Sequence, residues 1–272
     1  MNVMEASVKS KQEAKSEIKL RQLSGFFGAE VSGISLTNDV SEEAVSQLWA
    51  ALDQYRVLVF RNQGDVSPNQ LLSFASHFGT PETKKHPTHD DAEGAIGVKV
   101  LHSNATEVGG RVLDMWHTDG STRENTNYIS FLQAIDVPDY GRDTMFADMV
   151  VAYERLSEPV KAFIDGLVAE HSWGVQNPGA PSVYHPVVLP DRRTGKKALY
   201  VNRLYTRAIQ GLRNDESEAL LEFLMGQARI PELQLRVSWE PGTITMWNNE
   251  LTQHHLVFDR AYARTMHRVM VS

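Results

Sequence analysis

Apolar residues near the start of the chain recur three and four positions apart, which is the spacing of amphipathic helices. This pattern covers residues 41–55 and 67–79, and each segment opens on a serine that can cap a helix. A short apolar stretch over 56–61 predicts a strand between them. The front of the chain is therefore interpreted as scaffold.

The next segment, residues 80–112, is polar, contains glycine and is rich in histidine, and no hydrophobic period is sustained along it. Long segments of this kind are typical of functional loops. We therefore predict a loop here, of the kind that closes over a site as a lid.

Beyond residue 116 the pattern becomes mostly β, with short stretches rich in Val, Ile, Tyr and Trp separated by turn signals. Helices are expected at 159–170 and 215–227. The predicted strands are 128–134, 144–149, 184–189, 198–202, 233–239, 243–247 and 268–271. Many short strands with helices outside them predict a mainly β fold with flanking helices, a double-stranded β-helix of the jelly-roll or cupin-like type. We expect residues 1–19 to form a polar extension and residues 20–272 a single domain.

Composition narrows the chemistry that this fold can carry. The 272 residues are 42% hydrophobic and 22% charged, which suits one large globular domain. Ten histidines and no cysteine exclude disulfides and thiolate metal sites, so a metal would be bound by imidazole and carboxylate groups. A net charge of −7 disfavours nucleic acid as a partner, and the lysine- and glutamate-rich start has no apolar run for a membrane. A cytoplasmic enzyme is the simplest expectation.

Candidate metal ligands come from two distant segments. His117 and Asp119 are two positions apart, so on an extended segment both side chains point to the same side. Far downstream, a histidine pair follows a probable strand that ends at Trp247. Neighbouring residues on a strand face opposite sides, so only one of the pair can be a ligand, and we choose His254 over His255. Two histidines and one carboxylate form the facial triad of non-haem Fe(II) oxygenases.

Two arginines follow these candidate ligands. Arg264 and Arg268 lie ten and fourteen residues after His254. An arginine beside a metal can bind a carboxylate through its bidentate fork. A dicarboxylate co-substrate needs such a partner at the end that does not contact the metal.

The order of these motifs resembles that of a known family. Trp-His-Thr-Asp at 116–119 is followed by Gly-Arg-Asp-Thr at 141–144, His-Pro-Val-Val at 185–188, Trp-Asn-Asn-x-x-Thr-Gln-His at 247–254 and Met-His-Arg at 266–268. This series resembles the taurine dioxygenase and 2,4-dichlorophenoxyacetate dioxygenase family (TauD/TfdA) from about residue 20 onward. The Asn248 and His255 positions depart from the usual family residues.

The resemblance implies an enzyme that uses Fe(II), 2-oxoglutarate and O2 and releases succinate and CO2 as it oxidises, most commonly by hydroxylation, a small organic substrate. His117, Asp119 and His254 would bind the iron. Thr144 and Arg264 would bind the distal carboxylate of 2-oxoglutarate. Arg268 would face an anionic group of the substrate, with His86 as a second candidate, so a carboxylate or sulfonate is expected. Homo-oligomers are common in such a family.

Two other functions fit part of the pattern. A zinc hydrolase also uses two histidines and one carboxylate to hold a metal with an activated water, although Thr144 and Arg264 would then have no role. A cupin-like binding protein would hold a small anion in the barrel without catalysis, and would not need all these residues together.

Overall fold

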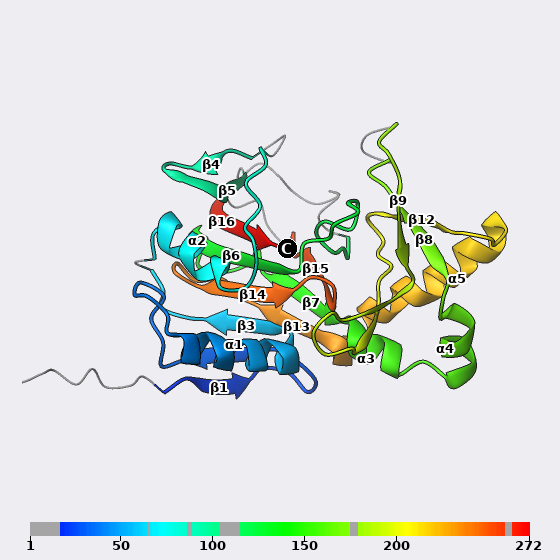
Figure 1. Cartoon of the computed structure of the whole chain (residues 1–272), viewed down its shortest axis with the longest axis horizontal. Coiled ribbons are helices and arrows are strands. Elements are labelled where there is room, and N and C mark those ends of the chain that lie inside the picture. Colours follow the sequence, from blue (N-terminus) through cyan, green and yellow to red (C-terminus); the bar gives the residue numbers. More distant parts are fainter. Residues whose placement is uncertain (1–16, 65, 86–88, 104–114, 175–178, 259–262) are drawn as a thin grey trace, which may run out of the picture.

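The largest sheet of the computed structural model has eight strands (Figure 1). The structure describes residues 17–64, 66–85, 89–103, 115–174, 179–258 and 263–272. Neighbouring strands of this sheet are antiparallel, except that β2 and β3 are parallel. In spatial order the strands are β1 (Lys19–Gln22), β2 (Ala29–Ser32), β3 (Val57–Phe60), β14 (Ile244–Asn248), β6 (Ile129–Asp136), β16 (Arg264–Val271), β5 (Ala95–Ser103) and β4 (Asp91–Ala92).

Smaller sheets complete the β structure. One antiparallel sheet has three strands, β13 (Gln234–Val237), β7 (Thr144–Asp148) and β15 (Thr252–Leu256). The candidate residues Thr144 and His254 lie on this sheet. A second sheet of three strands contains β12 (Thr206–Ile209), β8 (Val168–His171) and β9 (Val183–Pro186), and a ribbon pairs β10 (Val188–Pro190) with β11 (Lys197–Leu199). The described residues are therefore mainly β with flanking helices, as the sequence predicted.

Local capping chemistry fixes the two helices near the start of the chain. The Ser41 hydroxyl accepts the Ala44 N–H at the start of α1 (Glu42–Tyr55), which ends at Arg56 in the left-handed region with φ 62°. Ser67 and Gln70 form a reciprocal capping box at the start of α2 (Pro68–Ser76). Both helices were predicted. The others are α3 (Met149–Glu154), α4 (Glu158–Ile164), α5 (Asn214–Gly226) and the 3-10 turns η2 (Gln227–Arg229) and η3 (Pro231–Leu233).

None of these helices, within the described ranges, combines the length and apolar character needed to cross a membrane.

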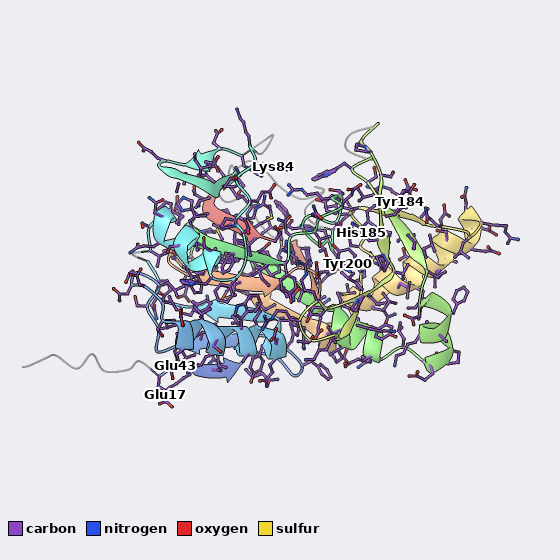
Figure 2. The ribbon with its side chains drawn as sticks, viewed as in Figure 1. Glu17, Glu43, Lys84, Tyr184, His185 and Tyr200 are labelled. Atoms are coloured by element: carbon purple, nitrogen blue, oxygen red, sulfur yellow. The ribbon has the colours of Figure 1, made fainter. Side chains whose placement is uncertain are left out.

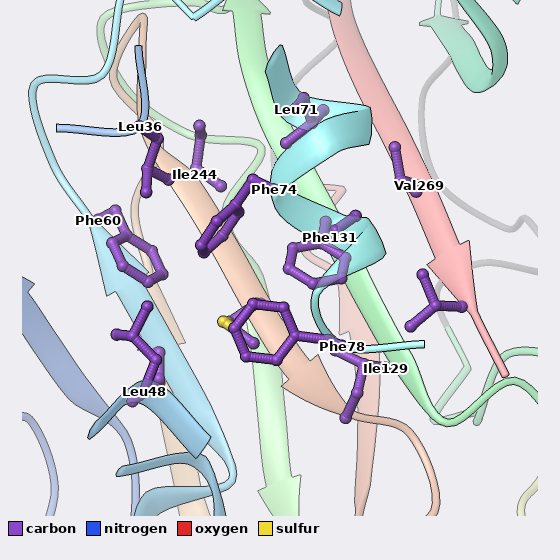
Figure 3. Packing of buried hydrophobic residues seen from close by; sticks show 14 of the residues in the cluster. Leu36, Leu48, Phe60, Leu71, Phe74, Phe78, Ile129, Phe131, Ile244 and Val269 are labelled. Atoms are coloured by element: carbon purple, nitrogen blue, oxygen red, sulfur yellow. The ribbon is translucent and has the colours of Figure 1, made fainter. Parts of the chain in front are cut away.

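One core lies between helices α1 and α2 and the outer face of the large sheet. Figure 3 shows the rings of Phe74 and Phe78 from the α2 region against Phe131 of β6. Both rings lie 5.7 Å from the Phe131 ring, between centroids, in tilted or edge arrangements that aromatic pairs favour. This packing holds α2 against the large sheet.

A second core lies between the inner face of the large sheet and the sheet of β7, β13 and β15. Phe146 of β7 is fully buried and meets Trp247 of β14 with ring centroids 5.3 Å apart. Leu132 and Met266 belong to the same cluster. The two sheets therefore face each other across one apolar layer, and the candidate ligands lie at its edge.

A third core fills the space around β8, β9 and α5. Strand alternation is visible on β9, where Tyr184 is exposed and His185 is buried. Figure 2 shows His185 beside Tyr200, and their ring centroids are 5.5 Å apart. His171 of β8 stacks on Tyr200 at 5.8 Å. These polar aromatics are part of the fold rather than of the candidate metal site.

Three sequence predictions need correction. Residues 80–112 were predicted as a loop, but the described part contains β4 and β5, which join the large sheet. The helix predicted over 159–170 ends at Ile164, because Gly166 adopts φ 86° and β8 begins at Val168. The single strand predicted over 184–189 is two strands, β9 and β10, separated at Val187.

Candidate active site

Backbone pairing brings the two distant histidines together. His117 forms an isolated antiparallel bridge with His254 of β15, in which each N–H donates to the other's carbonyl oxygen at 3.0 and 2.9 Å. Asp119 follows two residues later on the same side. One ligand atom from each of His117, Asp119 and His254 lies within 4.8 Å of the others, so the structure brings together all three sequence-predicted metal ligands.

Strand register decides which neighbouring histidine enters this cluster. His254 is paired with Phe146 and faces the inner apolar layer, where its ring lies 5.1 Å from that of Trp247. His255 is paired with Met145 on the opposite face, and its ring contacts that of Trp116 at 4.5 Å. The choice of His254 over His255 therefore agrees with the side on which each ring lies.

Burial keeps the cluster in the charge state that a cation needs. Burial lowers the pKa of His117 and, with His117 beside it, lowers the pKa of His254 to about 3. Burial alone would raise the pKa of Asp119, but Arg268 and the two imidazoles bring it down to about 2. Two neutral imidazoles and one carboxylate are therefore present near neutral pH.

The tautomer of His117 is also fixed. Its Nδ1 lies 2.8 Å from the Met115 carbonyl oxygen and donates to it. The lone pair is then on Nε2, which faces Asp119 Oδ1 at 3.8 Å, while His254 Nε2 lies 3.9 Å from Asp119 Oδ2. An outer hydrogen bond on the other ring nitrogen is the usual arrangement of a metal-bound histidine. The donor set suits Fe(II) or Zn(II), whose ligand atoms lie about 2 Å from the ion.

The two candidate 2-oxoglutarate residues each have a contact near the start of β7. Thr144 Oγ1 accepts the Trp239 indole N–H at 3.1 Å, which leaves the Thr144 hydroxyl proton to donate elsewhere. Arg264 Nη1 donates to the Arg142 carbonyl oxygen at 2.9 Å, two residues before Thr144. Burial, reinforced by the Arg142 charge, lowers the pKa of Arg264 to about 9, so the guanidinium remains charged at neutral pH. Within the described part of the chain, Arg264 has no carboxylate partner.

The second candidate arginine, Arg268, lies close to the metal-ligand cluster. Arg268 is four residues along β16 from Arg264, and its Nη1 is 3.6 Å from Asp119 Oδ2. Arg268 therefore lies beside Asp119, and Arg264 contacts the backbone two residues before Thr144. His86, the other candidate for substrate binding, lies outside the described residues.

The sequence did not single out two aromatic residues beside the cluster. The ring of Tyr205 lies 6.2 Å from that of His117, nearly perpendicular to it, and 4.8 Å from that of Trp173. Trp173 is 40% exposed. Neither residue belongs to a motif with ligand spacing, so only the three-dimensional arrangement shows that Tyr205 lies beside His117 and Trp173 beside Tyr205.

Known proteins resemble this chain in sequence over most of its length. The family model "Taurine catabolism dioxygenase TauD, TfdA family" matches residues 19–270. An α-ketoglutarate-dependent sulfonate dioxygenase of Saccharomyces cerevisiae is 33% identical over 89% of this chain, which spans 63% of that protein's length.

Solved structures give the same result. A taurine dioxygenase from Burkholderia xenovorans superposes with a TM-score of 0.84 and 34% identity, covering 93% of this chain and 89% of its own. The AAD-2 complex with Mn(II) and N-oxalylglycine superposes with a TM-score of 0.80 and 28% identity, covering 94% and 97%. The chain belongs to the taurine catabolism dioxygenase TauD, TfdA family and is an Fe(II)- and 2-oxoglutarate-dependent dioxygenase.

Proposed function

We propose that this enzyme oxidises, most simply by hydroxylation, a small organic substrate that carries an anionic group, and that it releases succinate and CO2. One observation carries the proposal: Arg268 lies 3.6 Å from Asp119 of the metal-ligand cluster, and Arg264 lies four residues away on the same strand, β16. Two separate cations on this strand suit one anionic co-substrate and one anionic substrate.

In this proposal His117, Asp119 and His254 hold Fe(II). The ion, once bound with 2-oxoglutarate, supplies the activation of dioxygen and the oxidation of the substrate. The protein's own residues hold the ligands in place: the Met115 carbonyl fixes the His117 tautomer, and the backbone bridge fixes the spacing of the two imidazoles. The apolar layer behind His254 excludes water from that side.

Thr144 and Arg264 bind the distal carboxylate of 2-oxoglutarate. Thr144 lies in the register position next to the Phe146–His254 pair on the same face, opposite Leu256. Two residues along a strand span roughly 6.6 Å, which is within reach of a five-carbon dicarboxylate whose other end is at the metal. The Thr144 hydroxyl proton and the charged Arg264 guanidinium are the donors that such a carboxylate needs.

Arg268 binds the anionic group of the primary substrate, and Tyr205 with Trp173 contacts its organic body. The names of the relatives support an anion, because one acts on sulfonates and another on taurine. His86 stays a sequence-based prediction for the same role.

The finer architecture belongs to this proposal too. We infer that the large sheet and the sheet of β7, β13 and β15 form the two sides of a jelly roll, supported by the core that they share. The family match over 19–270 supports a single domain after a short N-terminal extension. Homo-oligomer formation and cytoplasmic location stay predictions.

The test is to mix the protein anaerobically with Fe(II) and 2-oxoglutarate and to record the visible difference spectrum. A weak metal-to-ligand charge-transfer band is expected, and it should vanish in His254→Ala. The control is His102→Ala, which removes an exposed histidine of β5 that hydrogen bonds to Thr265. Absence of the band in folded, metal-loaded wild-type protein would favour a zinc hydrolase or a binding protein instead.

A further inference from the structure

A lysine lies next to the proposed substrate arginine. Lys99 of β5 and Arg268 of β16 are direct register partners, so their side chains leave the sheet on the same face. Directly opposed residues have Cβ atoms about 4.5–5.5 Å apart. The Lys99 side chain is 5% exposed and that of Arg268 is 14% exposed. Two cations are thus placed side by side at a buried position.

Neither cation has its hydrogen-bonding capacity filled by the described residues. The Lys99 ammonium has three N–H donors, and its one acceptor is Asp91 Oδ1 at 2.7 Å. That oxygen also accepts the Gly97 N–H at 2.8 Å. On the other strand, Arg268 Nε is buried without a hydrogen-bond partner. The Lys99 ammonium is thus bonded toward β4, its other neighbouring strand, while Arg268 on β16 keeps one donor unfilled.

The balance of charge points to an anion as the missing partner. Asp91 pairs with Lys99, and Asp119 lies 3.6 Å from Arg268. In the holoenzyme Asp119 is committed to the metal, so among the described residues Asp91 would be the one carboxylate left to pair with these two cations. Like charges directly opposite on a sheet are destabilising. An anion bound between them would remove this repulsion.

We propose that Lys99 is a second cationic residue of the substrate site and that, with Arg268, it binds a three-oxygen head such as a sulfonate or sulfate ester in preference to a carboxylate. This inference rests on the proposed function. A planar carboxylate fills the fork of one arginine with its two oxygens. A tetrahedral head has a third oxygen out of that plane, which the Lys99 ammonium would contact by turning from Asp91 toward Arg268.

A purely structural role for Lys99 makes a different prediction. If the Lys99–Asp91 pair only fastened β4 to β5, removal of either partner would have the same effect and neither would alter binding. If Lys99 binds substrate, removal of its side chain weakens binding, whereas Asp91→Asn leaves the ammonium in place and freer to contact the anion. The two variants therefore separate the roles.

The experiment measures calorimetric binding of 1-hexanesulfonate, hexyl sulfate and heptanoate to anaerobic protein loaded with Fe(II) and 2-oxoglutarate. Lys99→Met should weaken hexanesulfonate and hexyl sulfate binding about 10- to 100-fold, the usual effect of losing a charge-assisted hydrogen bond. Heptanoate binding should change less than about threefold, and Asp91→Asn should not weaken any of the three. Lys197→Met is the matched control, because Lys197 also pairs with an aspartate, Asp165, but at an exposed site.

The inference would be overturned if the Lys99→Met protein kept the wild-type affinity for hexanesulfonate. It would also be overturned if Lys99→Met and Asp91→Asn lowered that affinity equally. Lys99→Gln carries the same expectation if the Met variant does not fold. Wild-type protein that shows the charge-transfer band but binds none of the three probes would overturn the anion site and leave the proposed co-substrate chemistry standing. A missing band in wild type would instead count against both.

Discussion

Replacing Arg264 by methionine tests the co-substrate site directly. The substitution removes a buried guanidinium that is charged at neutral pH, because its pKa is lowered only to about 9. Loss of one partner from a buried charge pair costs about 2–5 kcal/mol. The Thr144 hydroxyl remains as a donor to the same carboxylate, so we expect the lower part of that range, about 2–3 kcal/mol. This corresponds to a roughly 30- to 150-fold weaker affinity for 2-oxoglutarate.

The assay is an anaerobic titration of the Fe(II)-loaded protein with 2-oxoglutarate, followed by the charge-transfer band. Arg213→Met provides the matched control, since Arg213 is 72% exposed and pairs only with acidic residues beside it on α5. Thermal stability should not fall in Arg264→Met, because the change removes a desolvated cation that lies close to Arg142. An unchanged 2-oxoglutarate affinity in a folded Arg264→Met protein would exclude this arginine from the co-substrate site.

Three further predictions concern the metal and the fold. Asp119→Ala should lose Fe(II) binding and succinate formation while its circular dichroism is retained; full activity would refute the ligand assignment. Burial lowers the pKa of His171 to about 3 from 6.5, so its contribution to stability is complete above pH 6.5 and falls as the pH drops toward 3. Between pH 7 and pH 5, the free energy of unfolding measured by chemical denaturation should therefore fall by about 2 kcal/mol less in His171→Phe than in wild type. An equal fall in the two proteins would contradict this. Phe131→Ala should lower the free energy of unfolding by about 3–5 kcal/mol, because a fully buried ring that packs on Phe74 and Phe78 is removed; a loss below about 1 kcal/mol would refute that packing.

Features that depend on local spacing were predictable from the sequence. The capping serines at 41 and 67 located both front helices to within a residue at their starts, because a cap is a contact between near neighbours. The two-residue spacing of His117 and Asp119 and the alternation of His254 and His255 similarly required only strand geometry. Local periodicity was sufficient to choose which side chains enter the site.

Features that depend on long-range pairing were not predictable in this way. The helix expected over 159–170 failed because Val168 to His171 finds strand partners in β9 and β12, which overrides a helical pattern. Residues 95–103 were predicted as loop because they lie within a long polar segment, whereas they form β5 by pairing with the distant strand β16 and with β4. Lys99 is one such residue, because its side chain is buried and its ammonium pairs with Asp91 of the neighbouring strand β4.

The proposed selectivity depends on strand register, whereas the candidate metal site depends on a short motif and one backbone bridge. His117 and Asp119 come from one short motif, and the backbone bridge to His254 completes the metal cluster. The position of Lys99 beside Arg268 depends instead on the register between β5 and β16. A one-residue slip in that register would turn the ammonium to the other face of the sheet while leaving the bridge between His117 and His254 unaffected. Substrate preference can thus change through a strand at the edge of the site without any change in the metal centre.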